Sequence, residues 1–178
     1  MGPRTRAAYH VADPGPSCVR IRMQPGRARA LLGRSVRDLV DRALPVKELR
    51  GLDADRLADD PVAALVKVLG PVDQDVIGRA AGLLADDTVA AAARRLHVSE
   101  RQLRTLFSDG IGLSPKHFAR IDRVRSVLAA GHGRQWAEVA AAAGYYDQSH
   151  MTAEFRQLMG VPPAAFVAGR RPVPRRCG

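Results

Sequence analysis

Residues 144–166 read GYYDQSHMTAEFRQLMGVPPAAF, and the stretch LFSDGIGLSPKHF at residues 106–118 follows a similar pattern. A second similarity lies upstream, where VAAAA occurs at residues 89–93 and again at 139–143, an offset of 50. Four residues further along recur at a constant offset of 48, namely Phe107, Gly112, Pro115 and Phe118 with Phe155, Gly160, Pro163 and Phe166. Such internal similarity predicts two units of the same fold, and the change of offset from 50 to 48 predicts a two-residue length difference in the turn.

Each unit is predicted to be a pair of short helices joined by a tight turn. Ser99 precedes Gln102 by three residues, which is the spacing of a capping box, so a helix should begin at about Glu100. In the second unit, Asp147 can cap a helix whose inner face carries Met151, among other apolar residues. A short helix before a turn and a capped helix after it is the arrangement that holds a second helix out for insertion into a DNA major groove.

The connection between the units is predicted to be one longer helix, from Pro115 to about Ala130, roughly 24 Å in length. His97 stands in the first turn, where such units commonly carry glycine, and must tolerate a left-handed or strained conformation there. The aromatic residues at recurring apolar positions are expected in the core: Phe107, Phe118, Trp136, Phe155 and Phe166.

Composition limits the choice of partner and of chemistry. The chain of 178 residues carries a formal net charge of +10, which favours polyanions or anionic membranes as partners. Cys18 and Cys177 suggest neither a zinc site nor a disulfide framework, and the histidines have no convincing metal-ligand spacing, so we expect no metal and no cofactor. The lack of an apolar run of roughly 20 residues predicts a cytoplasmic protein without a membrane partner.

Three motifs make the sequence similar to a known family: VAAAARRLHVSERQLRTLF, GLSPKHFARIDRVRSVLAAG and EVAAAAGYYDQSHMTAEFRQLMGVPPAAF. Residues 73–168 resemble the double helix-turn-helix DNA-binding domain of the AraC/XylS family of bacterial transcription regulators. The resemblance implies a mainly all-α fold with two helix-turn-helix subdomains and a linking helix, binding double-stranded promoter DNA, with RNA polymerase as a further candidate partner. It leaves any small-molecule effector unknown.

The remainder of the chain is predicted to flank this domain. Residues 18–72 resemble the end of the family's sensing domain, with a short strand at 18–23 followed by small helices. Residues 1–17 are predicted to be a disordered lead-in and residues 169–178 a basic tail.

The resemblance also indicates which residues would read DNA. On the first reading helix the base-facing positions are Arg101, Arg104 and Thr105, with Ser99 and Gln102 at the helix start, where Gln102 could reach a phosphate. Arginine suits base readout because its planar fork can donate two hydrogen bonds to guanine. The alternative for both arginines is a solvated surface position. On the second reading helix the expected contacts are Gln148, Ser149, His150, Thr152 and Arg156.

Ala153 departs from the arginine that many relatives carry, which suggests weaker base readout by the second helix. Plain helix capping is the alternative for Gln148 and Ser149.

An alkyl-transfer repair enzyme would need a cysteine cluster that Cys18 and Cys177 cannot supply, so the protein is not expected to be an enzyme. A shortened regulator that associates with an intact relative through residues 18–70, and so modulates it, stays open as the alternative to a sequence-specific transcription regulator.

Overall fold

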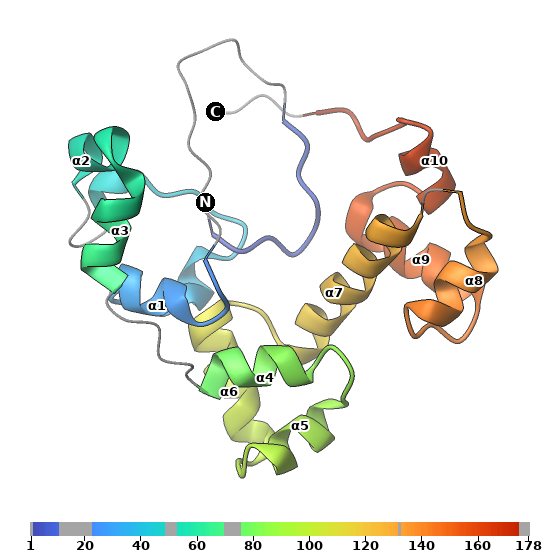
Figure 1. Ribbon diagram of the computed structural model, residues 1–178, viewed down its shortest axis with the longest axis horizontal. Helices are drawn as coiled ribbons and strands as arrows, with labels where there is room; N and C mark the ends of the chain where they lie inside the picture. The colour runs from blue at the N-terminus through green and yellow to red at the C-terminus, as the bar shows by residue number, and fades with distance from the viewer. Residues whose placement is uncertain (1, 11–22, 49–52, 70–75, 132, 175–178) are drawn as a thin grey trace. The chain divides into compact units, whose positions relative to one another are not determined.

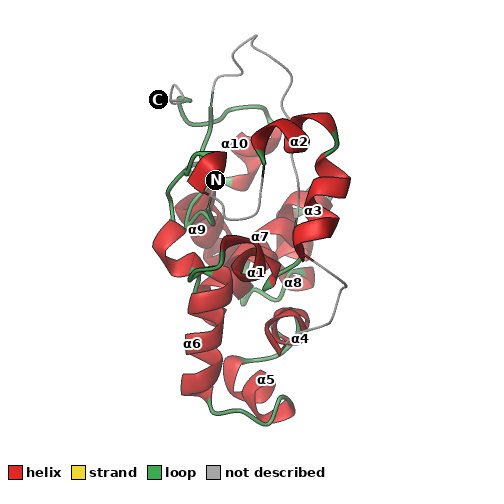
Figure 2. Cartoon of the chain, turned by 90° about the vertical axis from the view of Figure 1, so that its left-hand side faces the viewer, coloured by secondary structure: helices red, strands yellow, loops and turns green. Residues whose placement is uncertain are grey.

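The computed structural model describes residues 2–10, 23–48, 53–69, 76–131 and 133–174, and within these ranges it contains helices but no strand (Figure 2). The predicted all-α fold is confirmed. The strand predicted at residues 18–23 lies outside the described residues except for Met23, which is in a loop. The chain forms two compact units, one of residues 1–3 and 15–116, the other of residues 4–14 and 117–178.

The first unit holds the small amino-terminal helices and the first predicted helix pair (Figure 1). Its elements are α1 (Arg27–Leu32), η1 (Val36–Leu39), η2 (Val46–Glu48), α2 (Ala54–Asp59), α3 (Pro61–Leu69), α4 (Val76–Leu83), α5 (Val89–Arg95) and α6 (Glu100–Ile111). Helix α6 is central because α1, η1, α4 and α5 all contact it. Its fully buried residues are Leu103 and Phe107. Gly110 lets α4 approach closely, since a Cβ at that position would collide with the side chain of Ile77.

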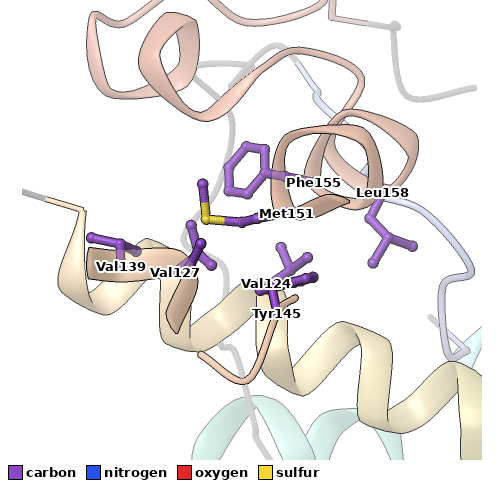
Figure 3. Close-up of a cluster of buried hydrophobic side chains, with 8 residues drawn as sticks. Val124, Val127, Val139, Tyr145, Met151, Phe155 and Leu158 are labelled. Carbon is purple, nitrogen blue, oxygen red and sulfur yellow. The ribbon is translucent and has the colours of Figure 1, made fainter. Parts of the chain in front are cut away.

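The second unit begins two residues into the linking helix α7 (Pro115–Ala130) and continues with α8 (Trp136–Ala142), α9 (Gln148–Met159) and α10 (Pro163–Val167). The predicted span of the linking helix agrees with these bounds. Figure 3 shows the core, in which apolar side chains from α7 and α8 meet those of α9. The buried cluster consists of Val124, Val127, Val139, Ala140, Tyr145, Met151, Phe155 and Leu158, with Trp136 and Phe166 packed against it.

Residues close to the amino terminus complete the end of α9 in the second unit. The amide of Ala7 donates to the carbonyl oxygen of Leu158 at 2.8 Å, and the Tyr9 hydroxyl donates to that of Met159 at 2.8 Å. The last carbonyls of a helix have no partner within it, so these bonds satisfy groups that would otherwise need water. The sequence had suggested a disordered lead-in at this place, whereas the structure gives residues 7 and 9 defined partners.

The predicted basic tail also has contacts within the second unit, over its described residues 169–174. The Arg171 guanidinium lies 4.6 Å from the centre of the Phe166 ring, a cation–π distance. Burial raises the pKa of Tyr9, and the charge of Arg171 acts in the opposite direction. The tail therefore packs through Arg171 against Phe166 of α10.

Candidate nucleic-acid interface

The two helix pairs turn in the same way. In the first, Val98 donates its amide to the carbonyl of Ala93 at 3.0 Å, and His97 has a φ of 55°. In the second, Tyr145 donates to Ala140 at 3.0 Å, and Gly144 has a φ of 73°. Of the two conformations expected for His97, left-handed or strained, the structure has the left-handed one, in the position that glycine occupies in the second turn.

These bonds correct the alignment of the two units. The turns correspond at an offset of 47 residues, so the VAAAA stretches, which repeat at 50, are not equivalent in structure. After the turns the offset becomes 48, because the N-caps of the second helices are Ser99 and Asp147. The length difference is thus one residue rather than two. Tyr146, between Tyr145 and Asp147, is the residue without a counterpart in the first turn.

The first reading helix, α6, begins with the predicted capping box. The amide of Gln102 donates to the Ser99 hydroxyl at 3.2 Å, and the amide of Ser99 donates to Gln102 Oε1 at 2.9 Å. Both side chains therefore serve the helix start. Arg101, Arg104 and Thr105 are exposed, as predicted.

The exposed residues of α6 differ in whether their side chains form hydrogen bonds or ion pairs. Arg104 forms an ion pair with Glu100 at 2.6 Å, and the Thr105 hydroxyl donates to the carbonyl of Arg101 at 3.1 Å. The guanidinium of Arg101 has no hydrogen-bond or ion-pair partner among the described residues. A surface ion pair is weak, so Arg104 can exchange Glu100 for another acceptor at little cost.

The second reading helix, α9, presents a more neutral outer face. Asp147 caps it by accepting from the amide of His150 at 2.7 Å. Since Asp147 supplies the cap, the hydroxyl of Ser149 and the amide of Gln148 are available at the surface. Four of the five predicted contact residues are exposed and Thr152 is half-buried; the exposed ones are Gln148, Ser149, His150 and Arg156.

A buried carboxylate joins α9 to the linking helix. Glu154 is 8% exposed and accepts from Arg120 Nε at 2.7 Å and from Arg123 Nη2 at 2.8 Å. The Tyr145 hydroxyl donates to the same carboxylate at 3.0 Å, and Arg120 also donates to the side chain of Gln157. We call Glu154, Arg120, Arg123 and Tyr145 the Glu154 network.

The network shifts the ionisation of two of its members. Burial alone would raise the pKa of Glu154, but the hydrogen bonds from Arg120, Arg123 and Tyr145 outweigh it and lower that pKa. Burial, the charge of Glu154 and the bond to it raise the pKa of Tyr145. Glu154 is therefore a carboxylate and Tyr145 a neutral phenol at neutral pH.

Helix α6 is attached by a different and more exposed set of polar contacts. Arg37, in η1, donates its Nε to the Ser108 hydroxyl at 2.8 Å and lies 3.4 Å from the carboxylate of Asp109. The Ser35 hydroxyl donates to Asp109 at 3.2 Å. The small helices that precede the first pair are therefore in contact with the reading helix.

The chain contains two copies of one arrangement: a short helix, a left-handed turn and a capped second helix. Comparison with known protein families identifies this arrangement. Residues 92–169 match a family model described as a helix-turn-helix domain. They are an AraC-type helix-turn-helix domain.

Several solved structures resemble the chain, and three of them follow. The C-terminal domain of AraT, a response regulator from Geobacillus stearothermophilus, is 24% identical, with a TM-score of 0.49 over 55% of this chain and 88% of that one. The DNA-binding domain of AdpA, a global transcriptional factor solved with a target DNA, is 25% identical, with a TM-score of 0.47 over 53% and 87%. ToxT from Vibrio cholerae O395 is 15% identical, with a TM-score of 0.50 over 72% and 54%. At this identity the likeness to ToxT concerns the fold alone. No match was found among curated protein sequences.

Most of the core predicted for the AraC-type domain is present. Phe107 and Phe155 are fully buried, and Trp136 and Phe166 pack on the second core, whereas Phe118 is half-buried.

The Glu154 network of the AraC-type domain was not predicted from the sequence. A signal existed, because Glu154 lies three residues after Met151 and four before Leu158, on the buried stripe of α9. A charged residue on such a stripe needs partners, and Arg120 and Arg123 of α7 supply them.

No group of three or more histidines, cysteines, aspartates or glutamates among the described residues could hold a metal ion. None of the helices described here is both long enough and apolar enough to cross a membrane.

Proposed function

We propose that the protein is a sequence-specific, DNA-binding transcription regulator whose helices α6 and α9 read two successive major grooves. The observation that carries this proposal is the duplicated helix pair, in which each second helix buries one stripe and exposes a polar outer face. On B-DNA, successive major grooves on one side lie roughly 34 Å apart. Two reading helices on one chain would therefore recognise a site in two parts without a dimer.

Helix α6 is proposed to supply most of the base recognition. Within the described residues, the guanidinium of Arg101 has no partner and that of Arg104 pairs with Glu100 alone, at the surface. Each can donate two hydrogen bonds to O6 and N7 of a guanine, which discriminates by about 1–3 kcal/mol against another base. Thr105, which is exposed next to Arg104 in the sequence, is proposed to make a base-edge or methyl contact. Ser99 and Gln102, which cap the helix, are proposed to lie against the DNA backbone.

Helix α9 is proposed to add a weaker and more neutral contact. Gln148 can pair with the N6 and N7 edge of an adenine, and Ser149 can bind a base edge or a phosphate. His150, Thr152 and Arg156 flank this surface, and the charge of Arg156 favours a phosphate. The net charge of +10 adds a general attraction to DNA that should decline steeply with salt.

Selection of binding sites from random duplex DNA tests the proposal. The wild-type chain should enrich a two-part site with its halves about one helical turn apart. Arg101→Ala/Arg104→Ala should relax the preference in one half and leave the other half intact. An Arg56→Ala/Lys67→Ala variant removes the same number of positive charges from exposed positions on α2 and α3, and it should select the wild-type site.

The other outcomes of this experiment are equally informative. If the double arginine variant selects the same site as the wild type, the assignment of Arg101 and Arg104 is wrong. If no sequence is enriched while the chain forms a complex with an intact relative, the alternative of an interaction protein is favoured. Contact with RNA polymerase is a further hypothesis, which transcription from the selected site would test.

A further inference from the structure

Tyr146 stands out in the second helix pair for two independent reasons. It is the additional residue of the second turn, since the first pair passes directly from Val98 to its N-cap Ser99. It is also 93% exposed, the most exposed of the large apolar or aromatic side chains in the described part of the chain. An inserted residue that contributes nothing to the core is a candidate for function.

The usual structural role for an apolar residue at this position does not apply. A residue directly before an N-cap often packs on the fourth residue of the helix, which here is Met151. The exposure of Tyr146 excludes that packing, and Met151 is buried by other side chains of the second core instead. Tyr146 makes no hydrogen bond and no ring contact with the described residues.

The backbone on either side of Tyr146 is firmly held. Tyr145 is buried, donates its hydroxyl to Glu154 at 3.0 Å and lies 5.2 Å below the guanidinium of Arg123. Asp147 caps α9 through the amide of His150. The Glu154 network and the cap therefore fix the residues before and after Tyr146. Its phenol group projects into solvent from a rigid turn beside the start of the reading helix.

We propose that Tyr146 is a contact residue for the DNA backbone, donating its hydroxyl to a phosphate that borders the groove entered by α9, and that the Tyr145–Glu154 bond positions it. This inference rests on the proposed function. Hydroxyl groups beside the amino-terminal end of a reading helix are common phosphate donors, and they fix the register of a protein on the duplex without reading a base. A neutral donor also releases no counterion of its own.

Equilibrium binding to the selected duplex, measured by fluorescence anisotropy at several salt concentrations, tests this inference. Tyr146→Phe removes only the hydroxyl and should weaken binding about 5- to 10-fold at every salt concentration. The slope of affinity against salt should stay at the wild-type value, whereas Arg156→Ala should reduce it by about one. Val62→Ala, at a position 69% exposed on α3, is the control for truncation of a surface side chain and should bind as the wild type does.

A double-mutant cycle tests the positioning role of Tyr145. Tyr145→Phe should weaken binding several-fold while circular dichroism at the assay temperature stays unchanged, and adding Tyr146→Phe should cost less than it does alone. Additive effects would overturn the positioning role.

The remaining outcomes separate the two proposals. Failure of the wild type to bind any duplex would reject the proposed function itself. Normal binding by Tyr146→Phe would overturn the phosphate contact. Loss with Tyr146→Ala alone would replace the phosphate contact with a contact of the ring, and a transcription defect with normal DNA affinity would assign Tyr146 to a protein partner.

Discussion

The two helix pairs share an apolar framework and differ in almost everything polar. Phe107 and Phe155 occupy equivalent buried positions, and Gly112 and Gly160 end α6 and α9 in the same left-handed conformation. By contrast, α9 is attached to α7 through the buried carboxylate of Glu154, where the equivalent residue of α6 is the apolar Leu106. The two units therefore share their buried apolar residues and differ in the polar contacts that hold the second helix.

The outer faces of the reading helices differ in the same way. Helix α6 exposes Arg101 and Arg104, whereas α9 exposes Gln148, Ser149 and Ala153 on the corresponding surface. Exposed positions carry little packing information, so they are free to diverge while the buried stripe is retained. The buried side of each helix therefore retains the repeat, and the exposed side, which we propose contacts DNA, has diverged.

Truncation of the buried aromatic residues is the most direct test of whether the two cores are equivalent. Phe107→Ala and Phe155→Ala should each lower the free energy of unfolding by about 4 kcal/mol, since both remove a fully buried ring and leave a cavity. Urea denaturation followed by circular dichroism measures the two losses. If one variant is nearly neutral, the two cores are not equivalent.

The difference in polar attachment predicts unequal effects of removing a carboxylate. Glu154→Ala should cost about 3 kcal/mol, because it leaves Arg120 and Arg123 without their shared partner in a mostly buried site. Glu100→Ala, which breaks the exposed pair with Arg104, should cost less than about 1 kcal/mol. Urea denaturation at neutral pH would show the contrast, and equal losses would contradict it.

Acid should weaken the attachment of α9 selectively. The folded-state pKa of Glu154 lies below its ordinary value of 4.5, so its stabilising contribution is present above pH 4.5 and is lost as the pH falls through the folded-state pKa. The difference in unfolding free energy between the wild type and Glu154→Gln should therefore shrink toward acid pH. A difference that stays constant between pH 7 and pH 3 would show that the charge of Glu154 contributes nothing.

Substitution of the left-handed residue in each turn should give the smallest changes in stability, and the two changes should have opposite signs. Gly144→Ala should destabilise by about 1 kcal/mol through backbone strain alone, since no described residue beyond its two chain neighbours has an atom within 4 Å of the added Cβ. His97→Gly should stabilise by about 0.5 kcal/mol, because relief of strain at a φ of 55° exceeds the entropy cost of glycine. Thermal unfolding of both variants measures the pair, and a destabilised His97→Gly would indicate that the imidazole has a structural role.

Local features of this fold could be predicted because they depend on residues close together in the chain. The capping box of Ser99 and Gln102, the cap at Asp147, the extent of α7 and the left-handed His97 each involve a few neighbouring residues, and all are present. The register of the repeat was wrong, because VAAAA stretches of low complexity align equally well at several offsets. Hydrogen bonds through the turn were needed to locate the inserted residue at Tyr146.

The sequence by itself determined that the chain forms two capped helix pairs joined by a longer helix, since apolar periodicity and capping act within one or two helical turns. Only the tertiary structure decided which charges are buried together and which surface residues are left without partners. Glu154 meets Arg123 and Arg120 across 31 and 34 residues, and Ala7 and Tyr9 reach the end of α9 from the far end of the chain. Such pairings depend on how the helices pack in space, and the spacing of residues along the chain does not predict which distant residues meet.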